Sequence, residues 1–340
     1  MKTANAFPRF VRAAIGIAVF ALGSVASAQS GPGKGETLRI QDYPGGGNTL
    51  VRIAIAKQYC EKYGIKCSVR QLANGPLGLQ AFLAGELEVA HGGSEGPLLA
   101  ISRGADIKAV SGGYGPQPFF LATRKGLELP NRAKGYPAVM ADLKGKKIGV
   151  PARGSNGETL FTELLADAGM TDKDITYVAV GGPGTAFPAL ANAQVDALMI
   201  FSPVDGFCEV KKACDIVVDL RKGEGPKAVK AAIGAGAPQW MSGDYAKKNP
   251  HVVKAFRLAL KDAESFVRNP ANFDEVVKIT ETYFKIPGED GDKILQATMR
   301  NSINGFTTVV PPEALQAVIN TMVANKQLTA SLKAETLILP

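Results

Sequence analysis

The fold is decided by a stretch that begins DLKGKKIGVPARGSNGETL, residues 142–160. It predicts a strand at Lys147–Val150, then a loop of glycine, serine and asparagine, then a helix with apolar residues on one face. Ser155 and Glu158 have the S-x-x-E spacing of a capping box, and Gly169 stands where a helix-terminating glycine belongs. We therefore expect a loop of small residues to lead into a helix start, whose free backbone N–H groups favour an anion.

The stretch continues to NAQVDALMIFSPVD, residues 192–205, and part of it is similar in sequence to an earlier segment of the chain. AFLAGELEVA (81–90) aligns with ALANAQVDAL (189–198), and this register places Ser94 opposite Ser202. In both halves, expected strands alternate with expected helices, which is typical of parallel sheets. We therefore expect two similar α/β lobes whose ligand lies beyond the carboxyl ends of the strands.

The residues 142–150, 154–157, 168–169 and 194–197 together resemble the second lobe of periplasmic solute-binding proteins of ABC importers. The subgroup is the one that serves aliphatic sulfonates, taurine, nitrate and thiamine-pyrimidine precursors. The resemblance continues at KKNPHVVKAF (247–256) and covers most of the chain after residue 36. It implies a two-lobe clamshell of the type II periplasmic-binding fold, each lobe a mostly parallel sheet flanked by helices.

The expected domain organisation follows from this strand order and from the resemblance. Lobe one comprises residues 37–123 and 237–340, and lobe two comprises residues 124–236. The lobe-one segment begins with a strand and an unbroken helix at Thr49–Lys62. Helices near 252–267, 273–284, 290–301 and 312–324 are expected to complete lobe one.

The N-terminus has the pattern of a secretory signal peptide, residues 1–28. Three basic residues precede the apolar run 13–25, and Ala26-Ser27-Ala28 forms an A-x-A cleavage site. We expect cleavage near Ala28 and a soluble periplasmic protein. Loss of the leader's three basic residues lowers the net charge from +8 to +5. The sequence has no run or stripe of basic residues that would indicate nucleic-acid binding.

All four cysteines follow the signal peptide, and an even number in an oxidising compartment indicates disulfides. Four cysteines allow three pairings. We favour Cys60–Cys67 and Cys208–Cys214, because each pair brackets a helix end and the next strand; four buried thiols are the alternative. The histidines, His91 and His251, have no metal-ligand spacing, so neither a metal nor a cofactor is expected.

The expected ligand contacts are small and polar residues in the loops between strands and helices. Glycine allows the backbone to approach a ligand closely, and serine and asparagine supply hydrogen bonds. Phe119 and Gln239 lie near the expected lobe crossings, where an aromatic ring could stack on a planar ligand, although core packing explains such rings equally well. The expected ligand-binding residues are Gly46, Gly47, Asn48, Gly93, Ser94, Glu95, Phe119, Ser155, Asn156, Gly157, Thr185, Ser202 and Gln239.

The resemblance implies capture rather than catalysis: a monomer that closes on a small solute and docks on an ABC permease. The solute is expected to be an organic sulfonate, a carboxylate or a pyrimidine-like ring. Phe201-Ser202-Pro203 replaces the aromatic-acidic pair that the subgroup often carries. The alternatives are the receptor of a TAXI-type TRAP transporter, a sensory receptor for a histidine kinase, and a pyrimidine-synthase-like enzyme. That enzyme's dense cysteine and histidine motif is missing from this sequence.

Overall fold

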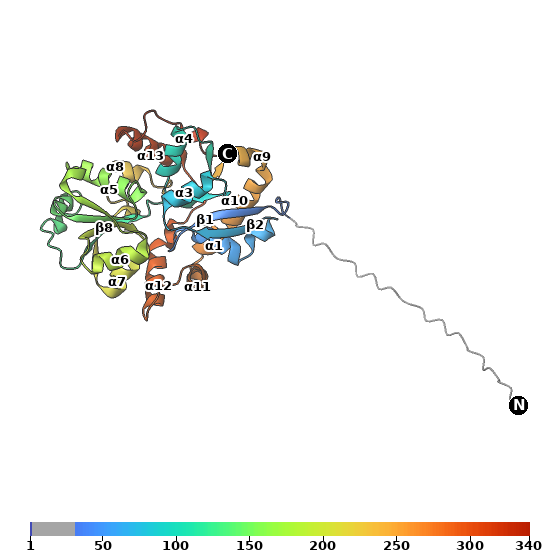
Figure 1. Ribbon diagram of the computed structural model, residues 1–340, viewed down its shortest axis with the longest axis horizontal. Helices are drawn as coiled ribbons and strands as arrows, with labels where there is room; N and C mark the ends of the chain where they lie inside the picture. Colours follow the sequence, from blue (N-terminus) through green and yellow to red (C-terminus); the bar gives the residue numbers. More distant parts are fainter. Residues whose placement is uncertain (2–30) are drawn as a thin grey trace.

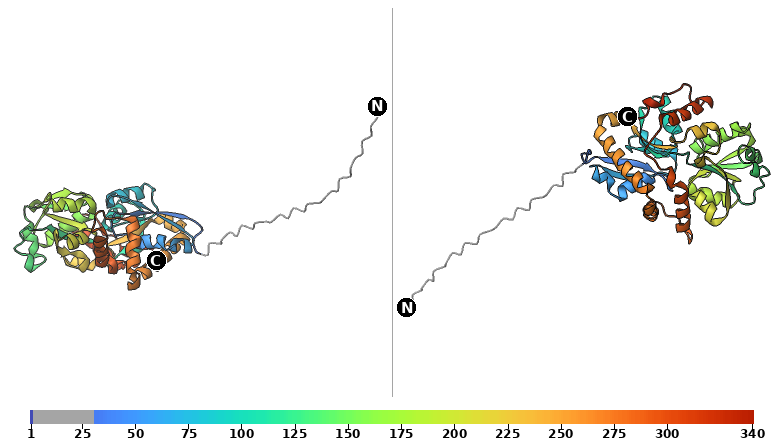
Figure 2. Two further views of the ribbon diagram at one scale, coloured as in Figure 1. Left: turned by 90° about the horizontal axis from the view of Figure 1, so that it is seen from below. Right: turned by 180° about the vertical axis from the view of Figure 1, so that it is seen from behind.

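The computed structural model describes Met1 and residues 31–340, so residues 2–28 of the expected signal peptide lie outside the described part. The chain forms two α/β lobes side by side, one green and yellow and the other containing both the blue and the red ends of the described chain (Figures 1 and 2). The expected fold class is confirmed, and both sheets are mixed rather than purely parallel.

The sheet of lobe one is assembled from distant parts of the chain. Strands β1 and β2 are parallel, and a bridge between Ile40 and Val89 joins them to β3. Strand β10, which returns from lobe two, pairs antiparallel with both β3 and β4, giving the order β2-β1-β3-β10-β4. The strands are β1 (Thr37–Asp42), β2 (Lys66–Gln71), β3 (Ala90–His91), β4 (Ile107–Tyr114) and β10 (Ala237–Ser242).

The sheet of lobe two repeats this arrangement. Its order is β7-β6-β8-β5-β9, and β5 is the antiparallel strand that arrives from the other lobe. Each lobe therefore holds its crossing strand at the same place, fourth in the sheet. The strands are β5 (Phe119–Arg124), β6 (Lys147–Val150), β7 (Thr176–Ala179), β8 (Ala197–Phe201) and β9 (Cys214–Asp219).

The expected end of lobe one at Thr123 needs correction, because this residue lies inside β5. Thr123 pairs with Ala197 of β8 and Asp215 of β9, both in the sheet of lobe two. The apolar run of β5 is buried on both faces in that sheet. Its composition therefore predicts a strand but does not indicate which lobe's sheet the strand joins. We propose that the first crossing lies between Tyr114 and Phe119.

Helices cover both faces of each sheet. The expected helix Thr49–Lys62 is interrupted at Gln58, which has a positive φ of 57° and separates α1 from α2. Helix α8 lies in the second crossing. Lobe one carries α1 (Thr49–Ala56), α2 (Tyr59–Lys62), α3 (Gly75–Leu83), α4 (Glu95–Ser102), α9 (Gly243–Lys248), α10 (Pro250–Arg268), α11 (Phe273–Tyr283), α12 (Gly291–Ser302) and α13 (Pro312–Ala324), and the remainder are α5 (Asn156–Asp167), α6 (Pro183–Ala191), α7 (Val204–Lys211) and α8 (Lys227–Ala231).

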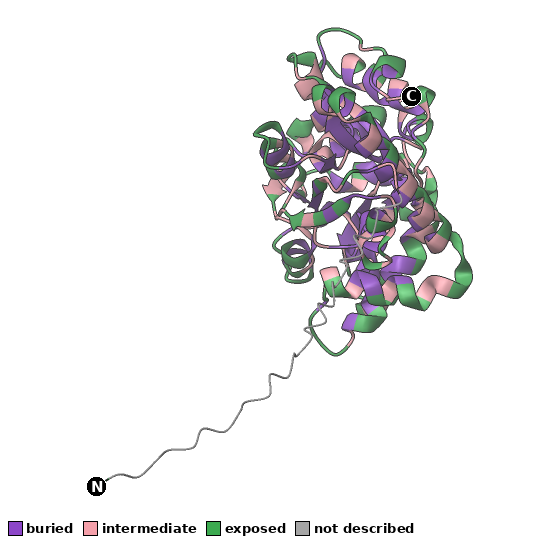
Figure 3. Cartoon of the chain, turned by 90° about the vertical axis from the view of Figure 1, so that its right-hand side faces the viewer, coloured by how far each residue is buried: buried purple, intermediate pink, exposed green. Residues whose placement is uncertain are grey.

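Buried residues concentrate in the sheets and on the inner faces of the helices, purple in Figure 3. Helix α10 shows why: Val252, Phe256, Ala259, Ala263 and Val267 recur at helical spacing and are all buried. Both predicted disulfides are present, Cys60–Cys67 and Cys208–Cys214. Within residues 31–340, no helix has the length and apolar character needed to cross a membrane.

Candidate functional site

A cavity of about 120 Å³ lies between the two lobes, where loops from both converge. Four of these loops lead into helices: Gly46-Gly47 precedes α1, Asn74 caps α3, Gly93 precedes α4, and Ser155 precedes α5. Helix N-termini therefore surround the cavity, and their first-turn N–H groups and partial positive charge favour an acceptor or an anion. Helix α3 offers fewer of these donors, because Pro76 has no N–H and the N–H of Leu77 donates to Asn74. Its lining comprises Tyr43, Gly46, Gly47, Asn74, Gly75, Pro76, His91, Gly92, Gly93, Tyr114, Pro118, Phe119, Pro151, Ser155, Asn156, Phe201, Ser202, Ala237, Ser302 and Phe306.

Aromatic rings line this central cavity from both lobes. On the lobe-two side, Phe119 and Phe201 meet edge to face with ring centroids 5.5 Å apart. On the other side, Tyr114 and Phe306 form a second edge-to-face pair at 5.3 Å. Rings in such pairs keep their orientation, so the cavity offers fixed apolar walls to a ligand.

The start of α5 differs from the predicted capping box. The carboxylate of Glu158 accepts hydrogen bonds from Arg153 Nε (2.9 Å) and from the backbone N–H of Gly154 (2.7 Å). Glu158 is therefore paired with Arg153, and the side chain of Ser155 makes no capping hydrogen bond. The Ser155 hydroxyl and both polar atoms of the Asn156 amide are buried without a partner, and both residues line the cavity.

A second cavity of about 420 Å³ adjoins the central one. The two cavities share lining residues, among them Tyr43, His91, Gly93, Ser155 and Asn156. We call the larger one the adjoining cavity. Its further lining is Gln41, Gly75, Pro76, Leu79, Leu83, Ala90, Gly92, Glu95, Gly96, Pro97, Leu99, Ala100, Arg103, Gly154, Thr159, Trp240, Met322 and Gln327.

The lobes touch directly around these cavities. A methyl group on Gly93 would lie 2.5 Å from Asn156 Nδ2, and one on Gly45 would lie 2.8 Å from the Ser202 carbonyl oxygen. Only glycine allows approaches this close between the two lobes. The side chains of Gln327 and Thr159 also meet across the boundary, with Nε2 donating to Oγ1 at 3.4 Å.

The central cavity is electrically neutral. Among the described residues, no aspartate, glutamate, lysine or arginine lines it. His91 also lines it, and burial lowers the pKa of its imidazole to about 4, so His91 is neutral at pH 7. Attraction of an anion here therefore depends on helix N-termini rather than on a cationic side chain.

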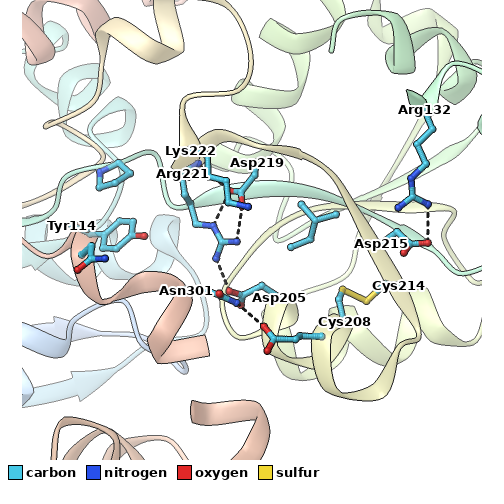
Figure 4. A pocket seen from close by; sticks show the side chains of 15 residues that line it. Tyr114, Arg132, Asp205, Cys208, Cys214, Asp215, Asp219, Arg221, Lys222 and Asn301 are labelled. Carbon is cyan, nitrogen blue, oxygen red and sulfur yellow. Dashed lines mark hydrogen bonds and ion pairs between the residues drawn. A yellow bond between two sulfur atoms is a disulfide. The ribbon is translucent and has the colours of Figure 1, made fainter. Parts of the chain in front are cut away.

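The arginine beside the central cavity is already neutralised. Figure 4 shows Arg221 at the edge of a third cavity of about 550 Å³, pointing between Asp219 and Asp205. Its guanidinium donates to Asp219 at 2.8 Å and to Asp205 at 2.5 Å, and also to the hydroxyl of Ser202, which lines the central cavity. Two carboxylates thus hold Arg221, so it supplies no free charge to a ligand.

Two carboxylic acids near the adjoining cavity have no such partner. Burial raises the pKa of Glu95 to about 7, and burial followed by the charge of Glu95 raises the pKa of Glu163 to about 8. Glu95 belongs to α4 of lobe one and Glu163 to α5 of lobe two. Within the described chain, neither carboxylate forms an ion pair.

Glu163→Gln is expected to stabilise the ligand-free protein at pH 8.5 but not at pH 5. Below the pKa that Glu163 has in the unfolded chain, the side chain is protonated in both states and does not reduce the stability. As the pH rises toward its higher pKa in the folded protein, the unfolded chain loses the proton more readily, so the free energy of unfolding falls. The glutamine removes that penalty, which is on the order of 2 kcal/mol. Urea unfolding at both pH values measures it, with the exposed Glu128→Gln as control; an equal effect of Glu163→Gln at both would show that Glu163 is solvated.

The structure gathers most of the predicted ligand residues at these cavities. Gly46, Gly47, Gly93, Phe119, Ser155, Asn156 and Ser202 line the central cavity, and Glu95 lines the adjoining one.

Five predicted residues do not line either cavity. Ser94 donates to the carbonyl of Ala235 at 2.6 Å, and Gln239 donates to Asn48 at 2.9 Å, so these side chains brace the loops. Gly157 packs against Phe119. Thr185 is exposed and bonds to the carbonyls of its own turn, at Val180 and Gly182.

Several lining residues were not predicted. Asn74-Gly75-Pro76 follows a strand and starts a helix, as the predicted loops do, so this pattern could have identified it. Tyr43 follows β1 directly. Ser302 and Phe306 come from the end of α12 and the loop after it, and no local pattern marks them as part of a site.

Comparison with known proteins supports a binding role for this architecture. A family model described as NMT1/THI5 like matches residues 48–272. A protein of Brucella abortus (strain 2308) that is named as a binding protein is 28% identical over 273 residues, covering 76% of this chain and 79% of its own. A Brucella suis protein named in the same way matches equally well.

Solved structures share the fold at low sequence identity. The alkanesulfonate-binding protein SsuA of Xanthomonas axonopodis pv. citri, bound to MOPS, superposes with a TM-score of 0.69 at 21% identity, covering 89% of this chain and 98% of that one. The periplasmic nitrate-binding protein NrtA of Synechocystis PCC 6803 gives 0.66 at 15%, covering 88% and 84%. DszB in complex with biphenyl-2-sulfinic acid gives 0.60 at 17%, covering 90% and 96%.

Proposed function

The chain belongs to the NMT1/THI5-like family, and from this membership we propose that it captures a small organic solute for an ABC importer. The observation that carries the proposal concerns the start of α5, where the Ser155 hydroxyl and the Asn156 amide are buried between the lobes without hydrogen-bond partners. Buried polar atoms in native proteins are nearly always hydrogen bonded to protein, ordered water or a ligand, so these atoms are available to contact a solute in the cleft.

The solute class that fits the central cavity is an organic anion, a sulfonate or carboxylate, or a pyrimidine-like ring. The helix N-termini supply N–H donors for an acceptor group, and the aromatic pairs at Phe119 and Tyr114 supply walls for an apolar or planar body. Two solved structures with this fold bear names that mention alkanesulfonate and nitrate.

We propose capture without chemical change. The relatives are named as binding proteins, and DszB, which has a similar fold, was solved in complex with biphenyl-2-sulfinic acid. In the capture cycle both lobes contact the solute, so the closed arrangement binds it better than the open one. The mature protein, cut near Ala28, would work in the periplasm as a monomer and deliver the solute to a permease.

Asn156→Ala is expected to weaken solute binding by about 10- to 100-fold, because a buried partner of the solute is removed. The measurement is a thermal-shift screen of the refolded mature protein against sulfonates, carboxylates, nitrate and pyrimidines, followed by calorimetry of each hit. A solute present at about 100 times its Kd adds about 2.7 kcal/mol of stability.

The matched control is Asn192→Ala, which changes an exposed asparagine elsewhere in lobe two. It should bind as the wild type does. A solute whose affinity is the same in wild type and Asn156→Ala would contradict the proposed site. Mass spectrometry of the released solute tests the absence of catalysis, since an altered mass would indicate an enzyme.

A further inference from the structure

Two hydroxyl groups meet at the wall of the central cavity, one from each lobe. Ser202 follows β8 in lobe two, and Ser302 ends α12 in lobe one. Their Oγ atoms lie 3.3 Å apart, and either atom can be the donor. Both residues line the central cavity, so a hydrogen bond between side chains joins the two lobes at this wall.

Arg221 lies behind this pair and fixes the role of the Ser202 oxygen. Its Nη1 donates to Ser202 Oγ at 3.3 Å. A guanidinium group has donors and no acceptor, so the Ser202 hydrogen must point away from Arg221. Asp219 and Asp205 hold the guanidinium in this orientation, as Figure 4 shows, and the Arg221 side chain is only 6% exposed.

The number of hydroxyl hydrogens decides what this wall offers to a solute. Tyr114 adds a third hydroxyl beside Ser302: burial raises the pKa of Tyr114 to about 12, and the Ser302 hydroxyl acts against that rise. Three hydroxyls in a row carry three hydrogens but have only two gaps, so at least one hydrogen is left for an acceptor outside the row. All three residues line the central cavity, and within residues 31–340 no hydrogen bond joins these hydroxyls to a further acceptor.

We propose that Arg221 is a positioning residue for the solute: by donating to Ser202 it makes the wall formed by Ser202 and Ser302 a hydrogen-bond donor, which holds an acceptor group of the solute. This inference rests on the proposed function and extends it to a residue that does not contact the solute itself. Hydrogen bonds in series polarise one another, so the positive charge at one end of the row strengthens the donor at the other end.

The neighbouring carboxylate explains why the guanidinium is needed for this direction. Asp205 Oδ1 is buried without a hydrogen-bond partner, and its other oxygen accepts from the same Nη1 that donates to Ser202. A carboxylate only accepts, so without Arg221 the Asp205 charge attracts the hydroxyl hydrogens. The row then presents lone pairs to the cavity instead of a hydrogen, and an acceptor group of the solute is no longer favoured there.

The test is a double-mutant cycle on solute affinity, which isolates the coupling between two residues. Calorimetry with the refolded mature protein compares wild type, Ser202→Ala, Arg221→Met and the variant with both changes. The probes are benzenesulfonate, benzoate, nitrate and uracil, and each one that binds the wild type is carried through the cycle. Each single change is expected to weaken binding by about 10-fold, and the combined variant by no more than either single change.

A structural role of Arg221 gives a different result. Arg221→Met would then weaken binding by the same factor with serine or with alanine at position 202, and this outcome overturns the inference. Arg221→Lys retains a charge and N–H donors, so it is expected to recover part of the affinity that Arg221→Met loses. The matched control is Ser265→Ala, an exposed serine on α10, which should bind as the wild type does.

Thermal unfolding of each variant confirms that it is folded before binding is compared. If Arg221→Met is unfolded, the cycle uses Arg221→Met together with Asp205→Asn, which removes one positive and one negative charge. Unchanged affinity in Ser202→Ala overturns the inference in either case.

The outcomes separate this inference from the proposed function. Equal effects in both backgrounds, or no effect of Ser202→Ala, remove the positioning role, while binding of any probe keeps the receptor role intact. Failure of all four probes and of every other compound in the thermal-shift screen overturns both.

Discussion

Arg52→Ala is expected to destabilise the protein by about 3–5 kcal/mol, because it leaves the carboxylate of Asp42 buried without its partner. The two side chains are fully buried, and Arg52 Nη2 donates to Asp42 at 2.9 and 3.0 Å. Burial raises the pKa of Asp42, and the charge and hydrogen bonds of Arg52 act against that rise. Urea unfolding of the ligand-free protein measures the loss.

The same substitution is expected to impair binding. Arg52 also donates to the carbonyls of Tyr43 and Gly45, which hold the turn that carries Gly46 and Gly47 to the central cavity. The control is the double variant Asp42→Leu with Arg52→Met, which removes both charges and should recover much of the stability without restoring the turn. An Arg52→Ala protein as stable as the wild type would show that the pair is not buried in solution.

Arg221→Met is expected to cost about 3–5 kcal/mol at pH 8 and less at pH 5. Burial lowers the pKa of Arg221, but the hydrogen bonds and charges of Asp219 and Asp205 raise it overall. Methionine preserves much of the packing over Phe120, above whose ring the guanidinium lies at 4.5 Å. It leaves the buried Asp205 without its ion-pair partner and leaves Asp219 with Lys222 alone, at 3.7 Å. Protonation relieves this penalty, so the loss must grow as pH rises.

Denaturant unfolding of Arg221→Met across this pH range gives the measurement, and Arg300→Met is the control. Arg300 pairs with Glu209 at 3.2 Å, and both side chains are about half exposed, so its loss should change stability by less than about 1 kcal/mol. A pH-independent effect of Arg221→Met would contradict the role assigned to the two aspartates.

Much of the fold could be predicted from the sequence because local signals agree with it. The strand Lys147–Val150 and the glycine at 169, which has a positive φ of 72°, follow directly from apolar pattern and helix-ending chemistry. The sheet to which β5 belongs could not be predicted, because a run buried on both faces has the same composition in either lobe. The break at Gln58 could not be predicted because no glycine or proline marks it.

The site could be predicted in part for the same reason. Loops between a strand and a helix have a recognisable composition, which predicts Gly46, Gly93 and Asn156, and the structure places all three at the central cavity. The orientation of a side chain within such a loop depends on its neighbours: the Ser94 hydroxyl donates to Ala235, whereas the Ser155 hydroxyl is buried at the cavity without a partner. Phe306 is brought in by tertiary packing alone.

The placement of the crossing strands also fixes the order in which the lobes can be completed as the chain is made from its N-terminus. All five strands of the second sheet lie between Phe119 and Asp219, so that sheet can close first. The first sheet cannot close until β10 is available, because β10 lies between β3 and β4. Until residue 242 has emerged, two strand edges stay open to other chains, and lobe one is the half that needs protection during biogenesis.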